Sequence, residues 1–324
     1  MNVAVILGLA AVLDPARSTW DEPWHEKVVQ EADCFVRLRV TACDGRSLSA
    51  DVLASLAGEK TAEKVVVDGF YALDLRSMTA GHGPELRFKA GFEGYFFLKK
   101  AKDRDAHLLA TPTAGYAAIG RDGVVATYRH SCHMALVETS FYEKTQVAIF
   151  EHLHGRPHDK DVIRKLFDDL LKQPPQELVG GDAEKMAAFF RQHVALECFY
   201  HFGEEKDYPR LEPFLKAASQ HVQISAVRAL SRIDTRESRA RLLEFLKAPG
   251  RDAFAKAMAV WGLRRLAARE AAPEMEKYMA DGPEEKCGFA LNIMDPRIGT
   301  KFPPSVKDAL RELLEEWKKA GPPK

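Results

Sequence analysis

Five histidines and one cysteine fall within a single stretch of this sequence, residues 126–161. Neutral imidazoles and deprotonated thiols are protein groups that bind zinc, and a thiol beside a cation becomes a nucleophile. The stretch therefore has three interpretations: a metal site, a covalent nucleophile, or a change of architecture that places polar side chains between two parts of the chain. The spacing of the residues favours the third.

The histidine spacing does not by itself form a metal site. His130 and His133 are three residues apart, which allows chelation on a helix but places the rings on opposite faces of a strand. His152 and His154 are two apart in a helical pattern, so they converge with His158 only if the helix ends there. Zinc needs three or four converging ligands. We therefore expect no metal and no cofactor, and a site formed by these five histidines is the alternative.

Cys132 has two histidines and an arginine as close neighbours in the sequence. A nearby cation lowers the pKa of a thiol, but no neighbouring Asn or Asp completes a catalytic triad. We expect a structural thiol and no catalytic residues, while a metal- or thiol-dependent enzyme at this junction is the alternative. The chain contains no CxxC spacing of the kind found in zinc and redox motifs.

Candidate binding residues lie in this stretch and in two other places. Arg129, His130 and His133 lie where a strand-like pattern gives way to a helix-like one. His82 lies between two glycines in "MTAGHGPELRFKAG", which favours a surface loop, with contact to a partner as the alternative. Trp261 falls at the edge of an apolar stripe, so it is either a contact anchor on an exposed face or part of the core.

Arginines recur in the second half of the chain. Arg232 and Arg265 become equivalent when the sequence is shifted by one repeat. Such a row forms either a basic groove for nucleic acid or an acidic peptide, or a ladder against carboxylates. Lys+Arg and Asp+Glu both total 47, so no surplus of positive charge favours nucleic acid. We expect a protein or peptide partner.

The first half of the chain carries the pattern of short strands. In "CFVRLRVT", Val36, Leu38 and Val40 alternate with residues of the other face, as in a half-buried strand. Asp44-Gly45 is a hairpin signal. Further short strands between Gly, Asp and Pro turns predict a small antiparallel β-barrel over residues 18–138.

This order of elements resembles the netrin-like or tissue-inhibitor-like modules that are built on an OB-type barrel. The matching positions lie within residues 20–120: Ala32-Asp33 before a strand, Leu56 to Gly58 at a strand end, and Gly91 to Tyr95 at a strand start. The resemblance implies an OB-like barrel. The N-terminal cysteine of the inhibitor family is absent, so protease inhibition is not carried over.

After Thr139 the apolar pattern becomes helical, which predicts a helical connector over residues 139–180. Beyond it the sequence repeats. "AVRALSRI" from Ala226 aligns with "AVWGLRRL" from Ala259, and an earlier copy begins at Ala195. The period of about 31 to 33 residues is typical of stacked helical pairs, none of which buries its apolar face alone.

The paired positions resemble HEAT repeats of the short bacterial kind over roughly residues 185–320, within a helical region of 181–324. The resemblance implies a curved α-solenoid with a surface for a protein or peptide, and catalysis is rare in the family. The sequence thus predicts an α+β fold: an OB-like barrel joined to an α-solenoid. The function it favours is non-catalytic binding of a macromolecule.

The apolar run from Val3 to Leu13 is too short to cross a bilayer and has the length of a signal-peptide core. Residues 1–17 are therefore either a signal peptide or the first buried element. The first interpretation places the protein in the periplasm or outside the cell, and the second in the cytoplasm. No transmembrane segment is expected.

Overall fold

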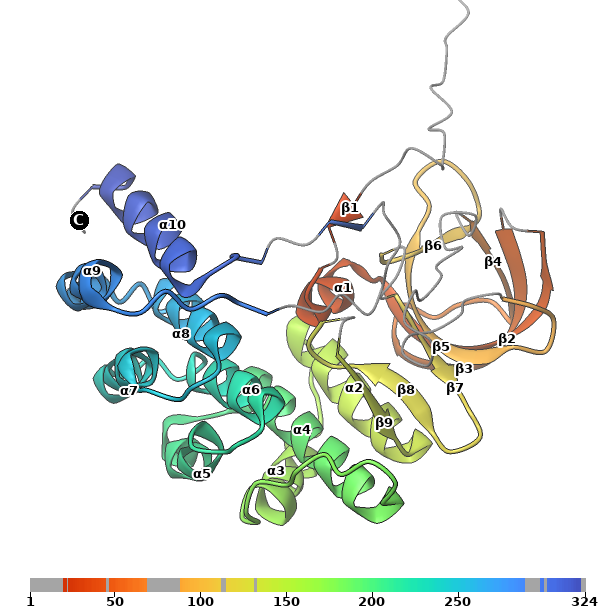
Figure 1. Ribbon diagram of the computed structural model, residues 1–324. Coiled ribbons are helices and arrows are strands. Elements are labelled where there is room, and N and C mark those ends of the chain that lie inside the picture. The colour runs from red at the N-terminus through yellow and green to blue at the C-terminus, as the bar shows by residue number, and fades with distance from the viewer. Residues whose placement is uncertain are drawn as a thin grey trace, which may run out of the picture.

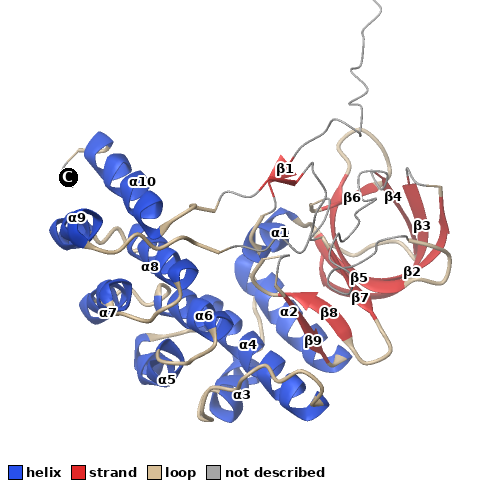
Figure 2. Ribbon diagram, viewed as in Figure 1, coloured by secondary structure: helices blue, strands red, loops and turns tan. Residues whose placement is uncertain are grey.

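The structure, a computed structural model, describes residues 20–21, 23–44, 47–68, 88–111, 115–130, 133–288, 298–299 and 302–321. The predictions made for residues 1–17, His82 and Cys132 lie outside this description. Strands and helices occupy separate parts of the molecule, as Figures 1 and 2 show, so the predicted α+β class with a barrel and a helical region is confirmed.

Five strands close into a barrel. Around the ring the order is β2-β3-β4-β6-β5, and β5 pairs with β2 to complete it. The β4–β6 pairing is parallel and the other four are antiparallel. The strands are β2 (Cys34–Cys43), β3 (Ser47–Gly58), β4 (Lys64–Asp68), β5 (Glu93–Lys100) and β6 (His107–Leu109).

The alternation predicted for the first long strand is present in β2. Val36, Leu38 and Val40 are buried in the barrel interior. Arg37 and Arg39 point outward, and both bind Glu93 on the neighbouring strand β5. This is the expected behaviour of a strand with one buried face.

Three more strands extend the sheet from β5 and meet two helices. They are β7 (Tyr116–Ile119), β8 (Val124–Thr127) and β9 (Met134–Val137), and the helices are α1 (His25–Glu31) and α2 (Thr139–Leu153). The strand pattern therefore gives way to helix directly after Val137. Phe35 and Phe97, on the outer face of the barrel, stack at 4.6 Å between ring centroids and belong to a core that continues through α2 into the later helices.

The remaining helices form two rows, which Figure 1 shows on the side away from the barrel. One row is α4, α6, α8 and α10, in which each helix packs on the next, while α3, α5, α7 and α9 lie along its outer side. The bounds are α3 (Lys160–Leu170), α4 (Ala183–Phe202), η2 (Glu205–Leu211), α5 (Glu212–Leu215), α6 (Gln220–Leu230), α7 (Arg236–Lys247), α8 (Ala253–Arg265), η3 (Arg269–Ala271), α9 (Ala272–Asp281) and α10 (Val306–Lys319).

Small residues allow the helices of the inner row to approach one another. Ala195, Ala226 and Ala259, on α4, α6 and α8, are all fully buried. At Gly262 a Cβ would lie 3.1 Å from Ser231 Cβ, closer than ordinary contact. The repeated small residues of the sequence thus mark helix–helix contacts.

The first described strand meets a short strand that precedes α10, between the barrel and the helices (Figure 1). Strand β1 (Trp20–Asp21) pairs in parallel with β10 (Ile298–Gly299). The described helices include none that is both long and apolar enough to cross a bilayer. Cys34 and Cys43 lie at opposite ends of β2, paired with Gly58 and Leu48, and both are free thiols.

Candidate binding site

A buried ion network joins the barrel part to the inner row of helices. Arg228 of α6 donates to Glu26 of α1 (3.1 Å) and to Glu197 of α4 (3.2 Å). Its guanidinium also lies over the rings of Trp24 (4.2 Å) and Tyr200 (4.4 Å). The network therefore pairs a desolvated cation with two carboxylates, and its partners come from both parts of the molecule.

Burial and charge act in opposite directions on the pKa values of this network. Burial by itself lowers the pKa of Arg228, but Glu197 and Glu26 outweigh it and the pKa is raised. Burial by itself raises the pKa of Glu26, but Arg228 outweighs it and the pKa is lowered. Both groups are therefore held in their charged forms.

Arg129, which follows β8, extends the network. It is 4% exposed, donates to Ser225 Oγ (3.1 Å) and lies 3.8 Å from Glu197. Ser225 in turn donates its single proton to Glu197 (2.6 Å), so it accepts a hydrogen bond from His193 Nδ1 (3.2 Å). This arrangement assigns the His193 proton to Nδ1, and its Nε2 is buried without a hydrogen-bond partner among the described residues.

Three imidazoles meet beside Arg129. The ring centroid of His133 lies 4.2 Å from that of His193 and 4.6 Å from that of His221. Burial, followed by the charge of Arg129, lowers the pKa of each ring, to about 4 for His221 and well below 6.5 for the other two. All three are therefore neutral at pH 7, and the cation beside them opposes binding of a metal ion.

An aromatic cluster covers the same junction. The ring of Trp24 lies 5.4 Å from that of His130, 6.1 Å from that of Trp261 and 6.0 Å from that of Phe302. Trp261 is half-buried and packs against the edge of the core beside Trp24. Arg129, His130 and His133 are buried, so these candidate binding residues hold the barrel against the helices and do not face outward.

Sequence reasoning missed the carboxylates and the serine of this junction. Glu197 lies in the apolar helix stretch "HVALECFYHF", and Glu26 lies in a short helix with Val28 and Val29. An isolated carboxylate in a buried helix requires a partner, which was the available signal. What the sequence could not give was the partner, because Arg228 is about 200 positions away from Glu26.

A cavity of about 200 Å³ opens on the other side of α6, where α2, α3 and α4 meet. His152 comes from α2, His158 and Lys160 from the start of α3, and Arg232 from the turn after α6. Phe202, at the end of α4, contacts both His152 (4.8 Å between ring centroids) and His158 (5.3 Å). Among the sequence candidates, Arg232, His152 and His158 are therefore brought together.

The charges of this cavity are unbalanced. Arg164 is paired with Glu204 (2.6 Å) and with Asp207. Lys160 and Arg232 are exposed, and their side chains make no ion pair or hydrogen bond within the described chain. By contrast Arg265, the repeat equivalent of Arg232, donates to Tyr200 Oη (2.7 Å).

Two imidazoles of the cavity, those of His152 and His201, have pKa values below the usual one. Burial, followed by His158, Arg232 and Lys160, lowers the pKa of His152. His201, at the back of the cavity, has a pKa lowered to about 3, chiefly because it is buried. The cavity therefore holds free cations beside two imidazoles whose pKa values are lowered.

The five histidines of the alternative metal site occupy three separate places. His152 and His158 lie in the cavity, His130 and His133 lie in the buried junction, and His154 bonds to the backbone oxygen of Val29 (3.0 Å). Across the described residues, no group of three or more His, Cys, Asp and Glu side chains has a geometry that could hold a metal ion.

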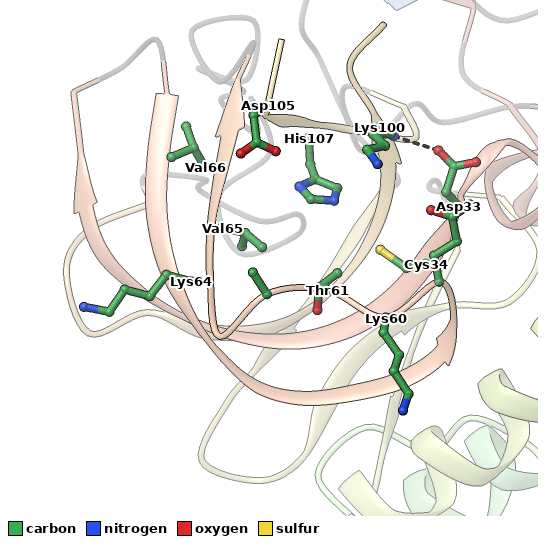
Figure 3. Close-up of a pocket in the computed structure, with 12 residues that line it drawn as sticks. Asp33, Cys34, Lys60, Thr61, Lys64, Val65, Val66, Lys100, Asp105 and His107 are labelled. Atoms are coloured by element: carbon green, nitrogen blue, oxygen red, sulfur yellow. Dashed lines mark hydrogen bonds between the residues drawn. The ribbon is translucent and has the colours of Figure 1, made fainter.

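A second cavity, of about 250 Å³, lies at one end of the barrel. Figure 3 shows the ring of His107 and the sulfur of Cys34 pointing into it, while Lys60 and Lys64 point away. Three lysines and three carboxylates line it, so it has no excess of either charge. Burial raises the pKa of Cys34 to about 12, which leaves that thiol unreactive at pH 7.

No protein-family model matches the chain. No curated protein and no solved structure matches it either. The molecule is therefore defined by what its own structure shows: a five-stranded barrel joined through a buried ion network to rows of antiparallel helices, with an open basic cavity beside the joint.

Proposed function

We propose that the protein is a non-catalytic binding protein, and that its partner is a protein that docks over the basic cavity beside the junction. The observation that carries this proposal is the state of Arg232 and Lys160. Most arginines of the helical part are bonded within the chain: Arg228, Arg239, Arg241, Arg264, Arg265 and Arg269. Two free cations at the mouth of one cavity are available to an acidic group from outside.

The arrangement of the helices supports a repeat-array interpretation. Ala195, Ala226 and Ala259 recur at helix contacts along the inner row, and the helices alternate between the inner and outer rows. We assign this part to a short HEAT-like α-solenoid on that basis. In such arrays the exposed surfaces that neighbouring helices share commonly bind proteins.

The order of strands supports an OB-like assignment for the barrel. A closed ring of five strands is the strand number of OB-type barrels. The barrel and α1 cover part of the inner row of helices through Arg228, Glu26 and Trp24. A partner therefore cannot reach that part of the row, whereas the basic cavity stays accessible.

The enzyme alternative receives less support from the geometry. Ser225, hydrogen-bonded to both His193 and Glu197, is fully buried, so a substrate does not reach its hydroxyl. Arg129 and Arg228 lie beside the buried imidazoles and carboxylates and already balance the charge that a metal would need. The buried network instead has the features of a structural joint.

Site-specific photo-crosslinking in cells that express the protein tests this proposal. A photoreactive side chain at Asp161, which is exposed on α3 beside the cavity, is expected to capture a defined protein. The same group at Ser55, exposed on β3, is the control position. The Arg232→Gln and Lys160→Gln variants are expected to abolish capture at position 161. Capture that occurs only from position 55, or that survives both substitutions, would contradict the proposal.

A further inference from the structure

The groups that line the basic cavity define the kind of acidic group that fits it. We propose that the cavity between α2, α3 and α4 binds a phosphate monoester, carried by a phosphorylated side chain of the protein partner. This inference rests on the proposed function and specifies the chemistry of its anchor point.

Two free cations supply the charge. Lys160 and Arg232 approach the cavity from different elements, α3 and the turn after α6, and the charges of both act on His152. A phosphate dianion carries more charge than a carboxylate and presents three oxygens in different directions. Two cations at two sides of one cavity therefore match the charge of a dianion better than they match the charge of a single carboxylate.

An imidazole of the lining, that of His152, supplies a further hydrogen-bond donor. The rings of His152 and His158 lie 5.2 Å apart at a steep angle of 85°, and both line the cavity. A neutral imidazole carries one N–H. His158 Nδ1 already donates to the backbone oxygen of Arg156 (3.2 Å), so His152 is the ring that can offer an N–H to a bound group. Together with the guanidinium fork and the ammonium group, this N–H gives the cavity donors from several directions, as a tetrahedral oxyanion requires.

The remaining residues of the lining do not compete for these donors. Ile163 and Phe202 form part of the wall, and burial beside apolar groups strengthens an ionic contact. Glu204 lies on the rim, but Lys206 (2.8 Å) and Arg164 (2.6 Å) already bind it. The only carboxylate in the described lining is therefore neutralised, and Lys160 and Arg232 face no competitor.

The cavity at the end of the barrel differs from the basic cavity in its balance of charge. Its lysines are matched by Asp33, Glu59 and Asp105 among the lining residues, so a phosphate would meet three carboxylates there. The cavity beside α6 has a net excess of basic groups, and the barrel cavity does not.

Binding to purified full-length protein tests the inference. The probes are inorganic phosphate, a phosphoserine peptide, the same peptide with aspartate in place of phosphoserine, and glycerol phosphate. Backbone NMR shifts report the location of binding, and calorimetry reports the affinity. We expect saturable shifts around His152 and Phe202 with phosphate and with the phosphoserine peptide, and much weaker binding of the aspartate peptide.

Matched variants separate this site from general attraction between charges. Arg232→Gln is expected to weaken phosphopeptide binding about tenfold or more, the usual effect of losing one charge-assisted hydrogen bond. Arg236→Gln is the control, because Arg236 is exposed, unpaired among the described residues and only four positions away. Its binding should stay within about twofold of the parent.

Several outcomes would overturn the inference. They are the absence of saturable binding, equal losses in the Arg232 and Arg236 variants, and equal affinity for the aspartate and phosphoserine peptides. If glycerol phosphate binds as tightly as the phosphopeptide, the ligand is a small phosphorylated metabolite and not a phosphorylated protein. Crosslinking from Asp161 is independent of these assays, so a partner captured there without phosphate binding would leave the proposed function standing.

Discussion

Two arginines four residues apart, Arg228 and Arg232, have opposite roles. Arg228 is buried between two carboxylates and two aromatic rings, and it joins the barrel to the helices. Arg232 follows on the next turn, lies exposed at the cavity and has no ionic partner among the described residues. The comparison teaches that residue type and helical spacing do not define the role of a basic side chain. Its role depends on which distant segment packs against it.

The largest expected effect is on stability, at the buried member of the pair. Arg228→Met should lower the free energy of unfolding by about 3–5 kcal/mol, because Glu26 loses its cation and the buried Glu197 is left with Arg129, 3.8 Å away. Urea denaturation followed by circular dichroism measures this change. Arg239→Met is the control, because Arg239 is half-exposed and pairs with Asp234 and Glu270. This substitution should lower the free energy of unfolding by less than about 1 kcal/mol.

Adding Glu197→Met to Arg228→Met tests the cause of that loss. The double variant also leaves the buried Arg129 without its carboxylate and Ser225 without its acceptor, so it should recover only part of the loss. Apolar groups replace a buried ion pair without cost only when no charged partner stays behind. A double variant less stable than the single one would show that the network contributes more than the avoidance of an unpaired charge.

The second expected effect is a loss of stability in acid. Burial lowers the pKa of His25 from 6.5 to about 4, and lowers those of His133, His193 and His201 as well. The unfolded chain therefore binds protons near pH 6.5 that the folded protein does not bind until the pH is much lower. Stability is complete above pH 6.5 and falls as the pH decreases toward 4.

The histidine contribution can be isolated by substitution. His25 is 1% exposed and contributes on the order of 3 kcal/mol to this acid loss, at about 1.4 kcal/mol per pKa unit. The His25→Gln variant should therefore lose less stability than the parent between pH 7 and pH 4.5 in urea denaturation. Parallel curves for the two proteins would contradict the assignment.

A third effect concerns the helix row that carries both arginines. Ala226→Leu should destabilise the protein by about 1–3 kcal/mol, because Ala226 is fully buried on α6 between its neighbouring helices. Ala240→Leu, on an exposed position of α7, should change stability by less than about 0.5 kcal/mol. Thermal unfolding of both variants measures the difference. Equal effects would show that the contact at Ala226 is loose.

The smallest effect on stability is expected at the exposed arginine. Arg232→Gln should change the free energy of unfolding by less than about 0.5 kcal/mol, because no contact within the described chain is lost. The same variant should lose capture of the partner. A fall in stability comparable to that of Arg228→Met would remove the contrast between the two arginines.

The sequence allowed prediction of those features whose physics is local. The alternation of Val36, Leu38 and Val40 predicted a strand with one buried face, and the change of period at Thr139 predicted the start of the helices. The recurrence of Ala226 and Ala259 marked positions where helices approach closely. Each of these signals comes from neighbouring residues along the chain.

The site depended on contacts that are not local. His133 meets His193 and His221 only because α4 packs against β9 and α6 packs against α4. His152 and Arg232 are 80 positions apart and share a cavity. No periodicity encodes such a meeting, so sequence reasoning named several of these residues without placing them together.

The pairing of β1 with β10 constrains how the molecule is made. On the ribosome, the strand at Trp20–Asp21 has no partner until residue 299 has emerged, and Trp24 lacks the ring of Phe302 until slightly later. Trp24 meets His130 and Arg228 earlier in synthesis, so the β1–β10 pairing and the contact of Trp24 with Phe302 are the contacts that form last at this junction.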